Sequence, residues 1–401
     1  MTPSIQIFLG PELIFEILDW LAVPLPFHQR FCDPSVLAAC STVCRTWSAH
    51  AQRLLFRRVI LPHNLYREPY SLAISGSTLP TFLAAIDPAT ERGRWLAACV
   101  VSFTFRRPGR QLTISDSAAV TALATALLRM PNLRHLDVTT ISCDFNTTTL
   151  ETLRESGPRI ASLHILQDIS LRTVHTHIMH RLVAAFPSIK LLEITTDLQT
   201  SLPPFDPPLN LALLSVKFNA NMVSDIGPCL ASLVRRPAAD SGDGDGEAEP
   251  LQLIWHKSTG TRPSELDGVL AAHGAGLRAL AVKTLDAAAA HAALARCTRL
   301  ERFELGRFPD TALLALIPRT ISALAISGAP DDARLDGLVD ALPSFPDLKV
   351  LTWSGCPLPR MFPALEVACT RRGVELRMTS AIEVADDNAI EVELRRRYIR
   401  I

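Results

Sequence analysis

The chain has 401 residues, of which 48% are hydrophobic and 20% charged, and its 40 Lys and Arg residues balance 40 Asp and Glu residues. This balance gives no indication of a polyanionic or polycationic partner, and the apolar content excludes wholesale disorder. A chain of this length would ordinarily form two or three domains, but a repeat array can extend this far on one continuous core.

The nine cysteines are scattered along the chain and include no C-x-x-C pair, which argues against a disulfide framework or a zinc module. The sequence also shows no secretory signal and no uninterrupted apolar run long enough to span a membrane. We therefore expect a cytoplasmic or nuclear protein that does not cross a membrane.

The first predicted element is a helix within residues 8–21, FLGPELIFEILDWL. Gly10 and Pro11 favour a helix start, because a proline at the first helical position loses no needed N–H. One narrow polar stripe is formed by Glu12, Glu16 and Asp19, and apolar side chains cover the rest of the helix. More than one face of this helix must therefore be buried.

A second helix start, Asp33 followed by Pro34, precedes an amphipathic stretch that reaches Trp47 and continues beyond it. The chain then changes to an apolar extended run, LLFRRVILP, which ends at Pro62. These segments predict a small helical hairpin. Three short helices this apolar cannot hide every face from one another, so we expect a partner surface.

Together these segments resemble an F-box over residues 8–61, in LGPELIFEILDWL, LAACSTVCRTW and LLFRRVIL. Leu9-Gly10-Pro11 stands where the family has Leu-Pro, with an additional glycine. The family's Val-Cys-Arg-x-Trp block is matched by Val43, Cys44, Arg45 and Trp47. The connection at 22–32, AVPLPFHQRFC, is longer and more apolar than is usual in the family.

The resemblance implies a three-helix domain that docks on the Skp adaptor of cullin-RING ubiquitin ligases, while the rest of the chain selects a target protein. Docking would act through apolar burial, and Trp47 has the alternative role of filling the hairpin's own core. For Cys40 and Cys44, one helical turn apart, packing is favoured over a redox pair. By motif position, the docking residues are Leu9, Pro11, Leu13, Ile17, Leu18, Leu21, Leu37, Val43, Cys44 and Trp47.

From about residue 95 onward the sequence repeats an apolar helix-like stretch, a Pro or Gly, and then the pattern apolar-x-x-apolar-x-apolar. Proline precedes several copies by two residues, which ends a helix and admits a strand, as at Pro131, Pro158, Pro187 and Pro346. The steps between copies are 21 to 29 residues, apart from one step of 39. The copies start at residues 133, 160, 189, 211, 250, 277, 300, 321, 348 and 373.

The long step contains residues 237–250, PAADSGDGDGEAEP, a stretch of small, acidic and glycine residues. Without these 14 residues the step is 25, an ordinary repeat. The stretch does not fit an EF-hand calcium loop, because Ala248 occupies the position that requires glycine. We expect a disordered surface insertion.

The body of the chain, roughly residues 95–380, resembles the degenerate leucine-rich repeats that follow many F-boxes, although Cys356 is its one clear match to the family's L-x-L-x-x-C form. The resemblance implies strand–helix units that stack into a curved array with parallel strands on the concave face. Variable positions between the core residues then point into the concavity. A protein surface is the favoured ligand there, and merely solvated side chains are the alternative. The candidate target-binding residues are His135, Asp137, His164, Glu193, Lys217, Lys283, Arg302 and Glu304.

Sequence motifs typical of nucleotide-binding, hydrolase and zinc-protease sites are absent, so an enzyme is not indicated. His175, His177 and His180 fall in VHTHIMH, where a polar helix exterior is favoured over a metal site because no acidic or thiol ligand is near in sequence. The C-terminal LRRRYIRI carries four arginines, and a solvated chain end is favoured over contact with nucleic acid or anionic lipid. We therefore predict no cofactor, metal, nucleic-acid or membrane partner.

The predicted fold class is α/β, with a three-helix F-box at 1–62, a linker or first-repeat lead-in at 63–94, a leucine-rich-repeat-like solenoid at 95–380 and a tail at 381–401. We expect a non-catalytic substrate-recognition subunit of an SCF-type (Skp–cullin–F-box) ubiquitin ligase, acting in ubiquitin-dependent protein degradation. Its partners would be the Skp adaptor, through it a cullin-RING ligase, and a protein substrate. The alternative is a repeat scaffold whose N-terminal helices only cap the solenoid, and an enzyme with an unrecognised site is more remote.

Overall fold

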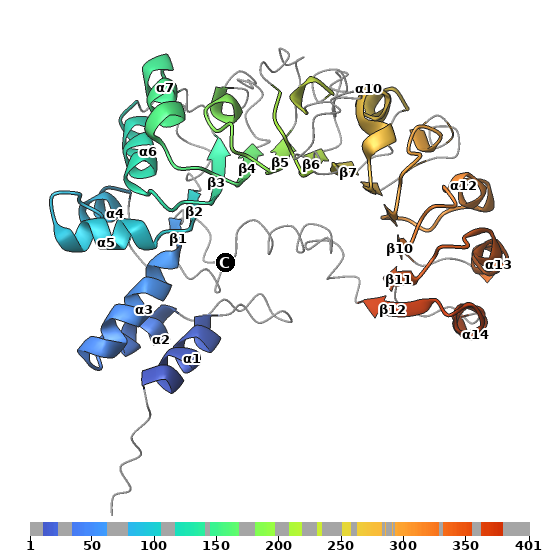
Figure 1. Ribbon diagram of the computed structural model, residues 1–401, viewed down its shortest axis with the longest axis horizontal. Coiled ribbons are helices and arrows are strands. Elements are labelled where there is room, and N and C mark those ends of the chain that lie inside the picture. The colour runs from blue at the N-terminus through green and yellow to red at the C-terminus, as the bar shows by residue number, and fades with distance from the viewer. Residues whose placement is uncertain are drawn as a thin grey trace, which may run out of the picture. The chain divides into compact units, whose positions relative to one another are not determined.

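The computed structural model contains two compact α/β units, within residues 1–160 and 161–400. In both units strands that are neighbours in the sheet run parallel, which agrees with the predicted α/β class. Figure 1 shows the elements in chain order. The structure describes residues 11–22, 34–61, 79–105, 117–140, 145–167, 181–196, 208–218, 231–234, 251–257, 263–282, 285, 291, 293–328, 332–354 and 362–379.

The first unit begins with three helices and continues into a parallel sheet. Helix α3 runs directly into β1, and β1, β2 and β3 pair in that order. The described elements are α1 Pro11–Ala22, α2 Pro34–Cys40, α3 Arg45–Arg57, β1 Arg58–Leu61, α4 Leu79–Ala85, α5 Glu91–Cys99, β2 Ser102–Phe105, α6 Ser117–Arg129, β3 His135–Thr140 and α7 Thr147–Ser156.

The second unit repeats a strand followed by a helical connection, and β4 to β12 pair in chain order. Its strands are β4 Ser162–Gln167, β5 Leu191–Thr196, β6 Leu213–Phe218, β7 Gln252–Lys257, β8 Ala279–Val282, β9 Arg302–Leu305, β10 Ala323–Ser327, β11 Val350–Ser354 and β12 Glu375–Thr379. Its helices are α10 Pro263–His273, α12 Thr311–Leu316, α13 Asp332–Ala341 and α14 Phe362–Arg372, with 3-10 turns η1 Gly274–Gly276 and η2 Leu342–Ser344.

Two ladders of apolar side chains run across the strands of the second unit on one face, called here the core face. Trp353 of β11 shows what this face packs against, because its ring contacts Phe362 of α14 edge-on at a centroid distance of 5.8 Å. The first ladder is Leu163, Leu192, Leu214, Leu253, Leu280, Phe303, Leu324, Leu351 and Leu376. The second is Ile165, Ile194, Val216, Trp255, Val282, Leu305, Ile326, Trp353 and Met378.

Every strand predicted from the repeat pattern is present, and each begins two residues after the predicted first position of its copy. Residue 133, for example, precedes β3 by two residues, and residue 348 precedes β11 by two. The second and third apolar positions of each copy therefore become the two core-face ladders, because alternate residues of a strand point to the same face.

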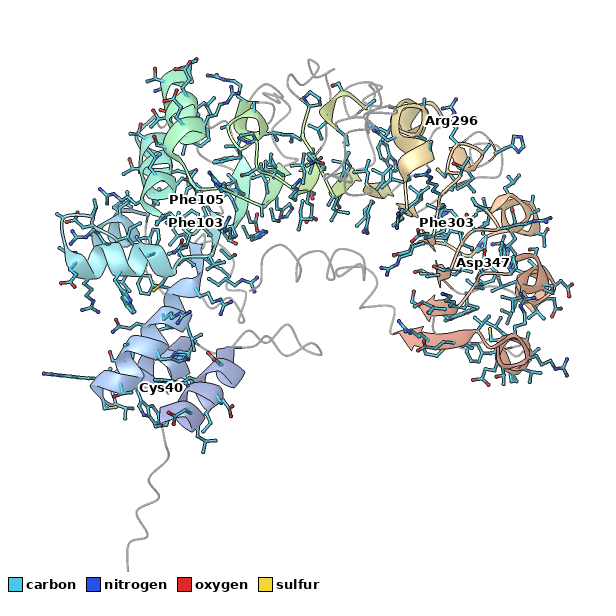
Figure 2. All side chains as sticks on the ribbon, viewed as in Figure 1. Cys40, Phe103, Phe105, Arg296, Phe303 and Asp347 are labelled. Carbon is cyan, nitrogen blue, oxygen red and sulfur yellow. The ribbon has the colours of Figure 1, made fainter. Side chains whose placement is uncertain are left out.

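Two strands of the sheet were not recognised as repeat copies. β1 and β2 show the same spacing as the later copies, in Phe56–Val59–Leu61 and Val100–Phe103–Phe105. Val59 pairs with Phe103, which pairs with Leu136, so the ladder of this unit starts inside the predicted F-box range. Phe103 and Phe105 on β2 are labelled in Figure 2.

The helices begin where local chemistry favours it. α1 starts at Pro11 and α2 at Pro34, the two predicted positions. α7 is capped by Asn146, whose side chain accepts a hydrogen bond from the Thr149 N–H at 2.7 Å, and α12 by Asp310, which accepts from Leu313 at 2.7 Å.

The predicted border at residue 62 follows β1 directly, and the range 63–94 contains α4 and the start of α5. These borders stay a prediction. The insertion at 237–250, the tail at 381–401 and the histidines 175, 177 and 180 lie outside the described residues, as do Cys356 and most of the connection at 22–32.

Candidate functional site

The three N-terminal helices share a small hydrophobic core of their own. Leu18 of α1, Leu37 of α2 and Leu54 of α3 are buried together, and the half-buried Ile14 and Cys40 pack against them. Cys40 is labelled on α2 in Figure 2. The three helices therefore pack against one another through apolar side chains of their own.

Polar and aromatic contacts fix α1 against α3. The Phe15 and His50 rings stack with centroids 4.5 Å apart, and the His50 Nε2 lies 2.9 Å from the Asp19 Oδ1. Asp19 is exposed and His50 is largely covered, so the carboxylate reaches over the edge of the ring stack. These contacts hold α1 at a defined rotation, which determines the face that it turns outward.

The three-helix unit exposes four large aliphatic side chains among its described residues. Leu13 and Ile17 of α1 are 47% and 45% exposed, although they follow each other by four residues on one helical face. Val36 of α2 and Val43 after it are 39% and 61% exposed. Large aliphatic side chains this open, on helices that already have a core, are typical of a surface that a partner covers.

The turn between α2 and α3 holds Val43 outward. The Val43 N–H donates to the Cys40 carbonyl at 3.2 Å, and the Ser41 and Thr42 hydroxyls donate to the Ala38 and Ala39 carbonyls at 2.6 and 2.8 Å. These bonds close the last turn of α2 on itself, so the backbone at Val43 has a defined position. The exposure of Val43 therefore comes from a tied turn.

The predicted docking residues divide between the outward face and the core. Leu13, Ile17, Val43 and Cys44 are exposed, whereas Leu18 and Leu37 are buried in the unit's own core. Trp47 is half-buried, so its side chain is partly covered by the unit itself. Pro11 and Leu21 lie in α1 with side chains that are not described, and Leu9 lies outside the described residues.

Val36 was missed by the sequence reasoning. It stands directly before the buried Leu37, and adjacent residues of a helix point about 100° apart. A large aliphatic residue directly beside a core residue in a short helix could have indicated that Val36 is exposed, because the two side chains point in different directions.

Those predicted target-binding residues whose side chains are described lie at the strand positions that alternate with the apolar ladder positions, on the side called here the opposite face. His135 and Asp137 in the first unit, and Glu193 and Glu304 in the second, are buried there. Arg302 is exposed, Lys217 lies in β6, and Lys283 lies outside the described residues.

His164 belongs to a polar group at β4 and β5. Its Nε2 lies 3.8 Å from the Glu193 Oε1 and 3.5 Å from the Thr195 Oγ1. Contact between any of these residues and a target stays a prediction.

Burial raises the pKa of three cysteine thiols. It raises the pKa of Cys297 to about 12, against a small opposing effect of Arg296, and it also raises the pKa of Cys369. Burial raises the pKa of Cys99 as well, and the positive charge of Arg53 lowers it by a smaller amount. In the described part of the chain, no group of three or more His, Cys, Asp or Glu residues is arranged to hold a metal ion.

The described helices include none that is both long and apolar enough to cross a membrane. No family model matches the sequence, and no curated protein matches it either.

Proposed function

We propose that this chain is a non-catalytic substrate receptor of an SCF-type ubiquitin ligase, in which residues 8–61 dock on a Skp adaptor and the repeat body captures a target protein. The observation that carries the proposal is the pair Leu13 and Ile17, which stay open on a helix whose other face is already packed. Both residues stand at positions that the F-box resemblance assigns to adaptor docking.

The body of the chain supports the receptor half of the proposal. Its repeated strand and helix, with apolar ladders in register over β4 to β12, are what a leucine-rich-repeat-like solenoid requires. Such an array offers one long row of strands to a protein ligand. The catalysis would be positional, since holding a target near a ubiquitin-charged enzyme raises its effective concentration without a nucleophile in this chain.

One observation favours the alternative in which the helices only cap the repeats. α3 packs against α5 and continues into β1, so α3 does cover the start of the sheet. α1 and α2 differ from α3, because they pack on α3 and on each other and direct Leu13, Ile17 and Val36 outward. A cap alone gives no reason for these side chains to remain apolar.

The test is co-purification of the full chain with a Skp protein, comparing the wild type with the double variant Leu13→Asp and Ile17→Asp. Covering the open half of each side chain is worth about 1 kcal/mol, so losing both weakens binding by at least about 30-fold. Two buried carboxylates weaken it further. The matched control is Val367→Asp with Met378→Asp, whose wild-type side chains are 49% and 47% exposed on α14 and β12.

We expect the control to bind the Skp protein like the wild type. Unchanged binding of the α1 variant would contradict the docking proposal. So would equal loss in both double variants, because it would mean that the effect is not located at α1. Unfolding of the chain by the α1 variant alone would favour the cap, and far-UV circular dichroism reports it.

A further inference from the structure

The last strand of the second unit, β12, is an edge strand. Among the described residues it pairs with β11 alone, and Figure 1 shows it at the end of the strand row beside α14. An edge strand presents backbone N–H and C=O groups that can pair with another strand. The Glu375 N–H donates to the Lys349 carbonyl on the β11 side, so the next residue, Leu376, turns its backbone groups toward the open edge.

The apolar core of the array is also uncovered at this edge. Leu376 and Met378 end the two core-face ladders. Their neighbours in β11, Leu351 and Trp353, are 0% and 1% exposed, whereas Met378 is 47% exposed and Leu376 is half-buried. In a repeat array each repeat is covered by the next, and the last one needs a cap. The edge of β12 therefore offers both backbone groups and apolar side chains to a further strand.

The charges of β12 determine which strand fits. Glu375 and Arg377 are exposed on the opposite face and bind each other through two contacts of 2.8 and 2.9 Å. Charges on an edge strand usually oppose pairing. Here they have opposite signs on either side of Leu376, so an antiparallel strand of the same sequence places Arg opposite Glu at both positions. Exposed ion pairs contribute little, so exchanging the pair within one chain for pairs between two chains costs little.

We propose that β12 pairs antiparallel with β12 of a second copy of this chain, about a two-fold axis at Leu376. In this register Glu375 of each copy lies opposite Arg377 of the other, and Val374 lies opposite Met378. An axis perpendicular to the sheet keeps both core faces on the same side, so the apolar ladders continue across the junction. An axis at Glu375 or at Arg377 would instead place like charges opposite each other. The sequence of β12 therefore favours one register.

The inference does not depend on adaptor docking, because β12 and α1 belong to different units. In the proposed receptor, pairing would bring two repeat bodies into one assembly. A target with two binding segments would then be held by both bodies, which raises its overall affinity.

The test is charge reversal in the full chain, with the mass in solution measured by sedimentation velocity at about 1–100 μM. We expect the wild type to dimerise as its concentration rises. Arg377→Glu places like charges opposite each other twice, so it should raise the dissociation constant of the dimer by about 30-fold, and Glu375→Arg should do the same. An equimolar mixture of the two variants should dimerise again, because each chain supplies the sign that the other needs. The matched control is Arg278→Glu, which breaks an equally exposed ion pair with Glu301 at 3.3 Å and should dimerise like the wild type.

A wild-type chain that stays monomeric over the whole range would overturn the proposal, because the edge would then be open, covered within the chain or reserved for a different partner. A dimer that survives both reversals, or that Arg278→Glu weakens equally, would overturn it too, since the contact would lie elsewhere. Failure of the mixture to dimerise would exclude the antiparallel register. Met378→Asp places a charge in the apolar junction and should weaken the dimer while leaving adaptor binding unchanged. Loss of adaptor binding in a chain that still dimerises would count against the proposed function alone.

Discussion

The proposed docking surface depends on α1 having two apolar faces with different roles, and substitution of Leu18 and Leu13 separates them. Leu18 is 1% exposed in the core with Leu37 and Leu54, whereas Leu13, five residues earlier, is 47% exposed. Replacing a core leucine by alanine destabilises by about 2–5 kcal/mol. Here the core is small and the residues packed against it are half-buried, so we expect about 2–3 kcal/mol for Leu18→Ala. For Leu13→Ala, an open surface position, we expect less than about 0.5 kcal/mol.

Hydrogen exchange of the α3 amides measures this difference locally, so it does not require the whole chain to unfold in one step. Leu18→Ala should speed exchange in α3 by about 30- to 150-fold, and Leu13→Ala by less than about threefold, as the free energies convert. Equal acceleration by the two variants would refute the reasoning, since it would mean that Leu13 also packs inside the unit. Ile17→Ala provides a second open position and should behave like Leu13→Ala.

Three further predictions concern Cys297 and Gly373 in the second unit. Cys297, with its pKa raised by burial to about 12, should resist iodoacetamide in the native protein at pH 8, while the exposed Cys44 is modified, as peptide mass spectrometry would show. The unfolded chain releases this thiol proton near the ordinary value of 9.0, so the Cys297 contribution to stability is lost as pH rises from about 9 toward 12, and a stability that rises over this range would contradict the assignment. Gly373→Ala should lower the free energy of unfolding by about 1 kcal/mol in denaturant titration, because Gly373 has φ +68° and an added methyl group meets nothing within 4 Å. A much larger loss would mean that the methyl group does meet a neighbour.

The strands of the repeat body were predictable because short parallel strands leave a fixed spacing of buried residues. A proline two residues before the first apolar position ended the preceding helix in several copies. No such proline precedes β2. The helix before it, α5, ends instead with a hydrogen bond from the Val100 N–H to the Ala97 carbonyl. β1 was assigned to the end of the helical domain because its residues belong to LLFRRVIL, one of the segments that resemble an F-box, and α3 does run into β1 without an intervening turn. Both were missed for local reasons, although the apolar spacing was present.

The candidate docking site was only half predictable. The sequence showed that α1 is apolar on more than one side, but Leu13, Ile14, Ile17 and Leu18 are equally apolar, so periodicity cannot say which pair faces the neighbouring helices. That choice is made by Leu37 and Leu54 and by the ring stack on His50, which are contacts between helices. Resemblance to a motif identified the positions, and packing decided which of them are open.

Burial on the opposite face was not predicted from the sequence, because the polar residues at its alternate positions indicated an open surface. The signal for a covered face lay in the other positions, since Leu191, Leu213 and Ile254 make β5 to β7 almost continuously apolar, as in LLEI and LQLIW. β12, by contrast, reads ELRMT, with Glu375 paired to Arg377 at 2.8 Å in solvent. Apolar residues on both sides of a strand are stable only when both sides are covered. The strand sequences therefore distinguish β5 to β7, whose residues are buried on both faces, from β12, which is largely exposed.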